Sequence, residues 1–361
     1  MPRLIPMVPR PAARVQAKRD PMATTGSPLI SAVIATYNEE RHIKACLAGL
    51  CAQVDLPGDL EIIVVDGNST DRTAEIVHAL AASDRRIRLI PNPGRYQVYA
   101  WNIGTRVSRG QYVAFCSAHT EYAQDYLARC YEAQQRTGAA NVGGVQTPIG
   151  EGLIGSAVAI AMQSPFGVGN AQFRYAQKEQ FVDSVFGDFF KKSVLLALGG
   201  YDESIPFNED SEFNYRLRQA GYSILLSPSI QVRYHVRSSL NGLAHQMFRY
   251  GFWRRRTQLE HPRYVPWRIM APPMMVLGTL LSLLVFALTK SLLGLVIPGM
   301  YVAFVGAATI AGAVRSRAPA LCLPLVLPVM HFAYGTGWWA GFFVHRKRGV
   351  RGALHQVAAT P

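Results

Sequence analysis

The chain has 361 residues, 49% of them hydrophobic and 17% charged, a length that accommodates about two domains of roughly 150 residues each. A mean hydropathy of +0.09 with so little charge excludes a disordered or fibrous chain, and five cysteines without a C-x-x-C pair argue against a disulfide framework or a zinc module. The 37 Lys and Arg exceed the 23 Asp and Glu, and the net charge of +14 favours anionic partners such as nucleic acid, anionic lipid or phosphorylated ligands.

The N-terminal segment 1–27 contains five basic side chains among several prolines and has no apolar run. It therefore lacks the apolar stretch that a signal peptide or a membrane span requires. We expect a flexible basic tail, with Met22 as an alternative start of the chain.

Strand and helix patterns alternate from residue 29 to residue 118. Apolar runs that end in polar loops predict strands at 29–36, 60–66, 86–93 and 110–118, and helical spacing follows the first three at 40–53, 73–83 and 96–108. This alternation predicts an α/β fold with a mostly parallel, Rossmann-like sheet and helices on both faces. Neither G-x-G-x-x-G after the first strand nor a P-loop motif is present, which removes the main support for a dinucleotide oxidoreductase or a P-loop enzyme.

Polar side chains follow the first two strands, where ligands bind in such sheets. Asp66 comes directly after four apolar residues, and on its own it is equally well explained as a helix cap. Thr36, Tyr37 and Glu39 at the end of the neighbouring strand favour a pocket for a base and a ribose, because an aromatic ring stacks on a base and carboxylates accept hydrogen bonds from N–H and hydroxyl groups.

Two histidines end later strands. Ser117 and His119 share a face at the end of the fourth strand, with Glu121 as a further candidate, and His235 ends an apolar strand at 223–235. Neutral imidazoles bind divalent cations, so His119 and His235 are candidate metal ligands. Structural hydrogen bonding is the alternative for each of them.

Three carboxylates, Glu209, Asp210 and Glu212, stand at the start of a helix that Gly221 stops. The helix dipole favours carboxylates there. Capping does not require three of them, and like charges in proximity raise the pKa of one, which suits a general base.

The segment 238–256 carries a polar and aromatic helical face at positions 246, 249, 250, 253 and 254. A basic amphipathic helix lying on a bilayer also explains this face, and the two interpretations are compatible. Gln246, Trp253 and Arg254 are therefore candidate wall residues of an active site.

Three apolar stretches without charged side chains follow at 270–289, 291–314 and 318–344, each long enough to cross a hydrocarbon core of about 30 Å. Arginines before the first stretch and basic residues after the last both indicate the cytoplasmic side of the membrane. Three full crossings would place these two groups on opposite sides. The third stretch contains Pro324, Pro328 and a GTG sequence, so it is the candidate for a re-entrant or interfacial segment. The clustering of basic residues beside these stretches favours anionic lipid over nucleic acid.

In their order and spacing, several motifs resemble family-2 glycosyltransferases of the GT-A fold, and within them a subgroup that acts in succinoglycan biosynthesis. The resemblance spans roughly residues 29–345, and its motifs are ATYNEE at 35–40, VVDGNSTD at 64–71, SAHTEY at 117–122, SPFGVGNAQFRY at 164–175, FVDSVFGDFF at 181–190, NEDSEFNYRLRQAG at 208–221, HQMFRYGFWR at 245–254 and HFAYGTGWWAG at 331–341.

The resemblance implies inverting transfer of a hexose, with glucose as the first expectation, from a UDP-sugar to an isoprenoid-diphosphate-linked saccharide at the cytoplasmic face of the plasma (inner) membrane. Asp210 matches the catalytic base, with Glu209 and Glu212 beside it. Tyr37, Glu39 and Asp66 would contact the nucleotide, Mg²⁺ or Mn²⁺ would neutralise the leaving diphosphate, and the helix of Gln246, Trp253 and Arg254 would close over the diphosphate and the acceptor entrance.

One departure concerns the metal. The family has Asp at the first position of its Asp-x-Asp motif, where this chain has Ser117. Either His119 with His235 or Glu121 holds the ion, or metal affinity is reduced. The alternatives to a simple transferase are a processive polysaccharide synthase on the same fold and a degenerate transferase without a donor site.

The sequence thus predicts a tail at 1–27, a GT-A catalytic domain at 28–240, an amphipathic interface helix at 241–268, a transmembrane region of two or three spans at 269–345 and a basic C-terminal tail at 346–361.

Overall fold

The computed structural model describes residues 29–169, 171–264, 267–315 and 317–343, so the predicted tails at 1–27 and 346–361 lie outside the described residues. Four parallel strands form the first half of its sheet in the order β3 (Ile87–Pro91), β2 (Leu60–Asp66), β1 (Ile30–Thr36) and β4 (Tyr112–Ser117). All seven residues of β2 are buried, because helices cover both faces of the sheet.

The covering helices divide between the two faces. One face packs on α1 (Ile43–Cys51), α2 (Thr73–Ser83) and α4 (Tyr126–Thr137). The other packs on α3 (Gln97–Val107), α7 (Lys192–Ala197) and α8 (Glu209–Gln219). The predicted α/β architecture with helices on both faces is therefore confirmed.

The second half of the sheet is mixed, where the sequence predicts mostly parallel strands. Strand β8 (Phe186–Lys191) runs antiparallel to both β4 and β6 (Asn141–Ile149), and β6 runs parallel to β9 (Ile224–His235). The short strands β5 (Thr120–Tyr122) and β7 (Gln180–Phe181) pair antiparallel with β9. The sheet is mixed because β8 inserts between β4 and β6, a long-range pairing that local periodicity does not encode.

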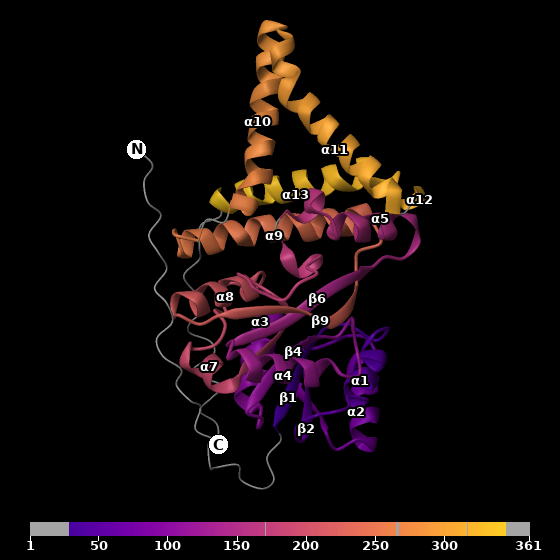
Figure 1. Ribbon diagram of the computed structural model, residues 1–361, viewed down its shortest axis with the longest axis vertical. Helices are drawn as coiled ribbons and strands as arrows, with labels where there is room; N and C mark the ends of the chain where they lie inside the picture. The colour runs from indigo at the N-terminus through magenta and orange to yellow at the C-terminus, as the bar shows by residue number, and fades with distance from the viewer. Residues whose placement is uncertain (1–28, 170, 265–266, 316, 344–361) are drawn as a thin grey trace.

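Apolar helices lie beyond the sheet (Figure 1). Helix α9 (Leu240–Glu260) and helix α13 (Leu323–Phe343) run side by side, and α5 (Gly152–Met162) joins their apolar cluster. A hairpin of α10 (Trp267–Thr289), η2 (Leu292–Leu295) and α11 (Val296–Arg315) projects away from them, and α12 (Arg317–Ala320) leads back to α13. In the part of the chain that the structure describes, two helical segments, Ile269–Thr289 and Leu292–Val314, are long and apolar enough to cross a membrane.

Glycines allow α9 and α13 to approach closely. A Cβ at Gly251 of α9 would overlap the carbonyl oxygen of Tyr334, and one at Gly337 of α13 would overlap that of Phe248. Trp338 of α13 donates a hydrogen bond of 2.8 Å to the side chain of Gln258. The third apolar stretch of the sequence, as helix α13, therefore packs against α9 and does not project with the α10–α11 hairpin.

Candidate active site

The carboxyl ends of β1, β2 and β4 meet at one edge of the sheet. Their register pairs Thr36 with Asp66 and Ala35 with Ser117. The Thr36 hydroxyl donates to the Asp66 carboxylate at 3.0 Å, and the Ser69 hydroxyl donates to the same oxygen at 2.6 Å. The carboxylate of Asp66 holds the loop after β2 through these hydrogen bonds. Because Asp66 is only 8% exposed, little of its surface is accessible to a ligand.

An aromatic and a cationic side chain lie together at the outer side of these strand ends. The Arg95 guanidinium stacks 4.1 Å from the centre of the Tyr37 ring and donates a hydrogen bond to its hydroxyl. Arg95 is exposed and has a positive φ of 64°. Sequence reasoning proposed Tyr37 and missed Arg95, because an isolated arginine in a loop carries no local signal.

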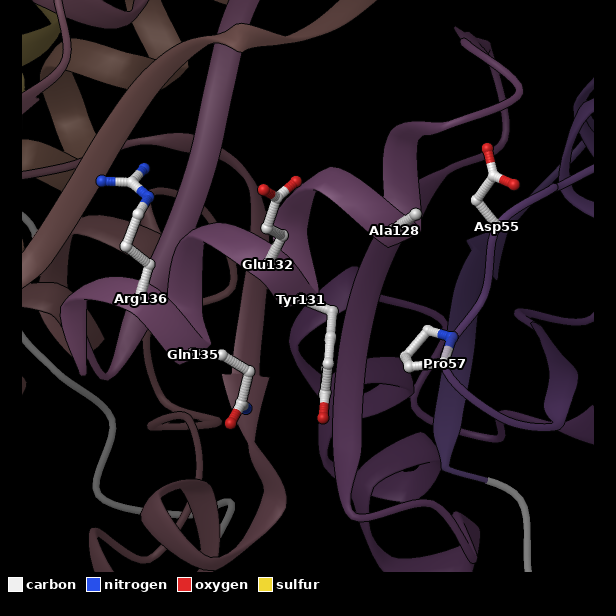
Figure 2. Close-up of a pocket in the computed structure, with 7 residues that line it drawn as sticks. All are labelled: Asp55, Pro57, Ala128, Tyr131, Glu132, Gln135 and Arg136. Atoms are coloured by element: carbon white, nitrogen blue, oxygen red, sulfur yellow. The ribbon is translucent and has the colours of Figure 1, made fainter. Parts of the chain in front are cut away.

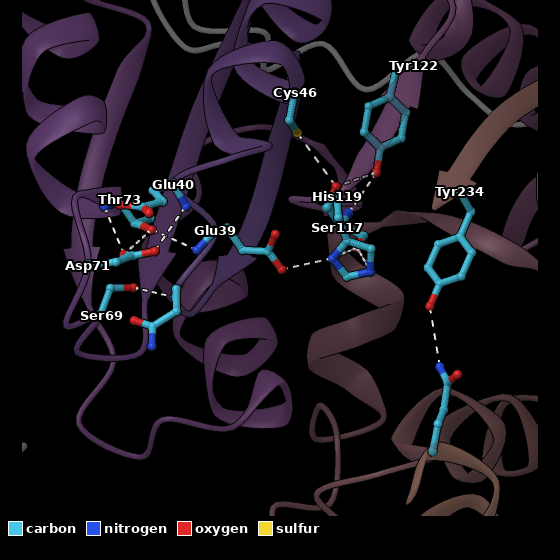
Figure 3. A network of polar contacts seen from close by, with 12 residues as sticks. Glu39, Glu40, Cys46, Ser69, Asp71, Thr73, Ser117, His119, Tyr122 and Tyr234 are labelled. Atoms are coloured by element: carbon cyan, nitrogen blue, oxygen red, sulfur yellow. Dashed lines mark hydrogen bonds and ion pairs between the residues drawn. The ribbon is translucent and has the colours of Figure 1, made fainter. Parts of the chain in front are cut away.

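Glu39, Ser117 and His119 come together as a polar cluster (Figure 3). His119 Nδ1 lies 2.9 Å from Glu39 Oε1, and its Nε2 lies 3.3 Å from the Ser117 hydroxyl. The imidazole also packs against the Tyr234 ring at 5.2 Å between centres. A carboxylate on one ring nitrogen fixes the tautomer and orients the other nitrogen, the arrangement that metal-ligating histidines use.

His235 is not brought to His119. On β9, Tyr234 faces His119, and alternation along the strand turns His235 to the opposite face. There its Nε2 lies 3.1 Å from Glu121 Oε1, and its ring packs on His42 at 5.5 Å. Within the described residues no group of three or more His, Cys, Asp or Glu side chains is placed to hold a metal ion.

A second cluster forms at the start of α8. Asn208 precedes the helix with a φ of 59°, and Glu209 behind it is 5% exposed and accepts a hydrogen bond of 2.9 Å from Gln97. Burial raises the pKa of Glu209 to about 8, and the adjacent charge of Asp210 adds to the effect. Asp210 itself is partly exposed. The two neighbouring carboxyls therefore differ, because Glu209 is buried with its neutral form favoured and Asp210 is accessible.

Glu212 lies with Arg216 and His261, separately from Glu209 and Asp210. It is 1% exposed, its carboxylate receives two hydrogen bonds from Arg216 at 2.7 and 2.9 Å, and His261 Nε2 lies 2.9 Å away. A buried carboxylate that is bound on both oxygens anchors α8 to α9 and the segment after it.

Asp188 on β8 is a site residue that sequence reasoning missed. It accepts a hydrogen bond of 2.6 Å from Asn141, which also binds Asn214 of α8 at 2.9 Å. Burial raises the pKa of Asp188 to about 7, with a further contribution from Asp210. An Asp between phenylalanines in an otherwise apolar strand is the signal that could have found it.

Helix α9 covers the cluster around Asp210. Arg254 donates 2.9 Å to the Tyr264 hydroxyl and 3.4 Å to the Asn208 side chain. Burial opposes its charge, but Tyr264, Tyr334 and Asp210 together raise the pKa of Arg254 above its usual value. Gln246 donates to the hydroxyls of Tyr250 at 3.2 Å and Tyr234 at 3.5 Å, and Trp253 packs 6.1 Å from the Phe207 ring. Gln246, Trp253 and Arg254 thus contact β9 and the segment before α8, and their role as the wall of an active site stays a prediction.

Known proteins are similar in sequence to most of this chain. Residues 31–195 match the profile of "Glycosyl transferase family 2". The chain is 31% identical over 331 residues to the succinoglycan biosynthesis protein ExoA of Rhizobium meliloti (strain 1021), which covers 90% of this chain and 98% of that protein. The chain belongs to glycosyltransferase family 2.

Two further relatives extend the comparison. The family-2 chain is 30% identical over 230 residues to the dolichyl N-acetyl-alpha-D-glucosaminyl phosphate 3-beta-D-2,3-diacetamido-2,3-dideoxy-beta-D-glucuronosyltransferase of Methanococcus voltae, covering 62% of this chain and 71% of that protein. The structure of the mannosyltransferase PcManGT from Pyrobaculum calidifontis in complex with GDP-Man and Mn²⁺ superposes with a TM-score of 0.55 at 19% identity, covering 88% of each chain. The fold is therefore GT-A, and the protein is a glycosyltransferase enzyme related to polysaccharide biosynthesis.

A groove also lies away from these clusters (Figure 2). It has a volume of about 510 Å³ and is lined by α4 and by the loop before β2. Pro57 in that loop precedes β2, and Gln135 binds the hydroxyl of Tyr112, the first residue of β4. The groove therefore lies at the amino ends of the strands, opposite the polar clusters.

Proposed function

We propose that this enzyme transfers a hexose, glucose being the first expectation, from a UDP-sugar to an isoprenoid-diphosphate-linked saccharide with inversion at the anomeric carbon. The observation that carries the proposal is the unequal pair Glu209 and Asp210 at the start of α8, beneath the wall formed by α9. The ExoA relative supports polysaccharide biosynthesis, and the Methanococcus relative, a dolichyl N-acetyl-alpha-D-glucosaminyl phosphate transferase by name, supports a lipid-linked acceptor.

Asp210 is the proposed general base. Burial and the charge of Asp210 raise the pKa of Glu209, which favours its neutral form and reduces the negative charge directly beside Asp210. Asp210 takes the proton of the acceptor hydroxyl while that oxygen forms a bond to the anomeric carbon. The bond from that carbon to the diphosphate breaks on the opposite face, and the configuration inverts.

The donor nucleotide is proposed to lie along the ends of β1, β2 and β4. Tyr37 with Arg95 provides an aromatic and cationic surface for a base, and the Thr36 and Asp66 pair lies beside it. Glu39 and Ser117 line the adjoining position toward His119. These contacts also accommodate a guanine nucleotide, so the preference for uracil requires a direct test.

A divalent cation, Mn²⁺ or Mg²⁺, is the proposed cofactor. The His119 imidazole, oriented by Glu39, fits the role of a single protein ligand, and Ser117 contributes a neutral hydroxyl in place of the family's Asp. His235 is not in the proposed set, because it faces Glu121. When bound, the ion would neutralise charge on the leaving diphosphate. The PcManGT structure, which is a complex with GDP-Man and Mn²⁺, supports this use of a metal.

We also propose that the chain is integral to the plasma (inner) membrane, with its catalytic domain (28–240) on the cytoplasmic side, the 241–268 segment at the interface and 269–345 as the apolar region. The α10–α11 hairpin exposes large apolar side chains, for example Leu288 at 76% and Val302 at 70%. A hairpin that crosses and returns, with α13 along α9, leaves the basic residues on both sides of the apolar region on one face of the bilayer, as the positive-inside rule requires.

Donor binding in detergent tests the proposal. UDP, GDP and their glucose, galactose and mannose forms are titrated with Mn²⁺, Mg²⁺ or EDTA. Metal-dependent selection of one UDP-sugar supports the assignment and identifies the donor. Selection of a GDP-sugar would replace the UDP-sugar as the proposed donor. If no nucleotide binds under any condition, the donor site has been lost, Ser117 marks that loss, and the protein is a degenerate transferase.

A further inference from the structure

Arg174 is a cation for which the proposed mechanism has no use. It ends the short helix η1 (Gln172–Arg174), is partly buried, and its Nε is buried without a hydrogen-bond partner. Its Nη1 lies 3.7 Å from the sulfur of Met162, and its Cζ lies 5.1 Å from the centre of the Phe173 ring. Burial lowers the pKa of Arg174, Tyr250 and Tyr234 act in the opposite direction, and no ion pair joins Arg174 to a carboxylate among the described residues.

These two tyrosines place Arg174 near the two polar clusters. Tyr234 packs its ring against His119 at 5.2 Å. The carbonyl of Tyr250 accepts a hydrogen bond of 3.1 Å from Asn208 at the start of α8, and the charge of Asp210 acts on its hydroxyl. Each of the two tyrosines that act on the charge of Arg174 therefore also contacts one of the two clusters, so Arg174 is near both of them.

The apolar helices reach the same position. Met162, which touches Arg174, ends α5 and belongs to the apolar cluster that α5 forms with α9, α11 and α13. The guanidinium thus lies at the boundary between the polar clusters and the apolar cluster of the helices. A ligand with an anionic head and an apolar chain matches both surroundings.

Burial of a cation without an anion is unfavourable, because the lost hydration is not replaced. The cost is recovered when a ligand brings the anion, and the planar guanidinium donates two parallel hydrogen bonds to phosphate oxygens. We propose that Arg174 binds a diphosphate that enters between Tyr234 and Tyr250. This inference rests on the proposed function, in which two molecules carry a diphosphate: the nucleotide-sugar donor and the isoprenoid-linked acceptor.

Matched ligands with and without a diphosphate test the inference. The full chain in detergent, with Mn²⁺ present, is titrated with UDP against uridine, with farnesyl diphosphate against farnesol, and with inorganic pyrophosphate. For Arg174→Gln, binding of the diphosphate ligand is expected to weaken by about tenfold to a hundredfold, with no change for its phosphate-free counterpart. Arg174→Lys, which keeps the charge but not the planar fork, is expected to weaken binding less.

The pattern of losses identifies the source. A loss confined to UDP assigns Arg174 to the donor, and a loss confined to farnesyl diphosphate assigns it to the acceptor. The control is Arg129→Gln, which removes the same charge from an exposed ion pair with Asp125 on α4 and is expected to leave every affinity unchanged. An equal loss in the control would overturn the inference, because net charge alone would then explain the effect.

Thermal stability separates a ligand-binding role from a structural one. Because Arg174 pairs with no carboxylate in the described residues, Arg174→Gln without ligand is expected to melt at or above the wild-type temperature. A lower melting temperature together with unchanged diphosphate binding overturns the inference and leaves the proposed function intact. A wild-type chain that binds none of the diphosphates overturns both.

Discussion

Replacing Glu209 by Gln is expected to stabilise the protein at alkaline pH, whereas the same change at Glu212, on the same helix, destabilises it. Both side chains are almost fully buried, at 5% and 1% exposure. They differ in their partners, because Glu209 has the neutral amide of Gln97 and Glu212 has Arg216 and His261. An amide at position 209 keeps the hydrogen-bond acceptor and never ionises.

The magnitude follows from the pKa of Glu209. Burial raises it from 4.5 to about 8, so the folded state binds the proton more tightly than the unfolded state. Stability is therefore fully present below pH 4.5 and is lost as pH rises toward about 8. At about 1.36 kcal/mol per pKa unit the loss is at most about 5 kcal/mol. The change at Glu212 breaks a buried ion pair and costs about 3–5 kcal/mol.

Thermal unfolding in detergent, followed by tryptophan fluorescence at pH 5 and pH 9, measures both effects. A domain of about 200 residues shifts its melting temperature by about 2–4 °C per kcal/mol. Glu209→Gln is expected to melt on the order of 10 °C above the wild type at pH 9 and close to it at pH 5. Equal melting of this variant and the wild type at pH 9 would refute the assignment of Glu209 as a buried, protonated carboxyl.

Three further changes test the site and the packing of the helices. Asp210→Asn is expected to lower transfer by about 10²–10⁴-fold in a radiolabelled-sugar assay without changing UDP binding, and transfer at the wild-type rate would end its assignment as the base. Ser117→Asp adds a carboxylate beside His119 and is expected to lower the Mn²⁺ concentration required for half-maximal activity; an unchanged titration would place Ser117 away from the ion. Gly337→Leu, which drives a side chain into the backbone of Phe248, is expected to lower the melting temperature, whereas Gly299→Leu, where a Cβ meets open space, is not. Equal melting of the two glycine variants contradicts the close packing of α9 on α13.

The sequence was sufficient for features that depend on local periodicity. The parallel strands β1 to β4 and the helices between them follow from alternating apolar runs, and Thr36, Asp66 and Ser117 converge because parallel strands end at one edge. The polar wall of α9 also follows from helical spacing. These inferences require no knowledge of which distant segments meet.

The features that the sequence did not predict depend on contacts between residues that are distant in the chain. Asp188 reaches the candidate site because β8 inserts between β4 and β6, and Arg174 of η1 is positioned by its contact with Met162 at the end of α5. His235 is separated from His119 because one residue along a strand reverses the face. Glu212 is a carboxylate like Glu209 and Asp210 beside it, but it differs from them because it binds Arg216 and His261.

Helix α9 makes contacts on two faces, and these contacts limit where the chain can be truncated. One side holds Gln246 and Arg254 against the polar clusters, and the other presents Gly251 and Phe248 to α13. Truncation before α9 would remove the wall of the site, and truncation after it would expose the surface that α13 covers. We therefore expect no shortened fragment to be both water-soluble and fully active, so purification and crystallisation require the intact chain in a lipid or detergent environment.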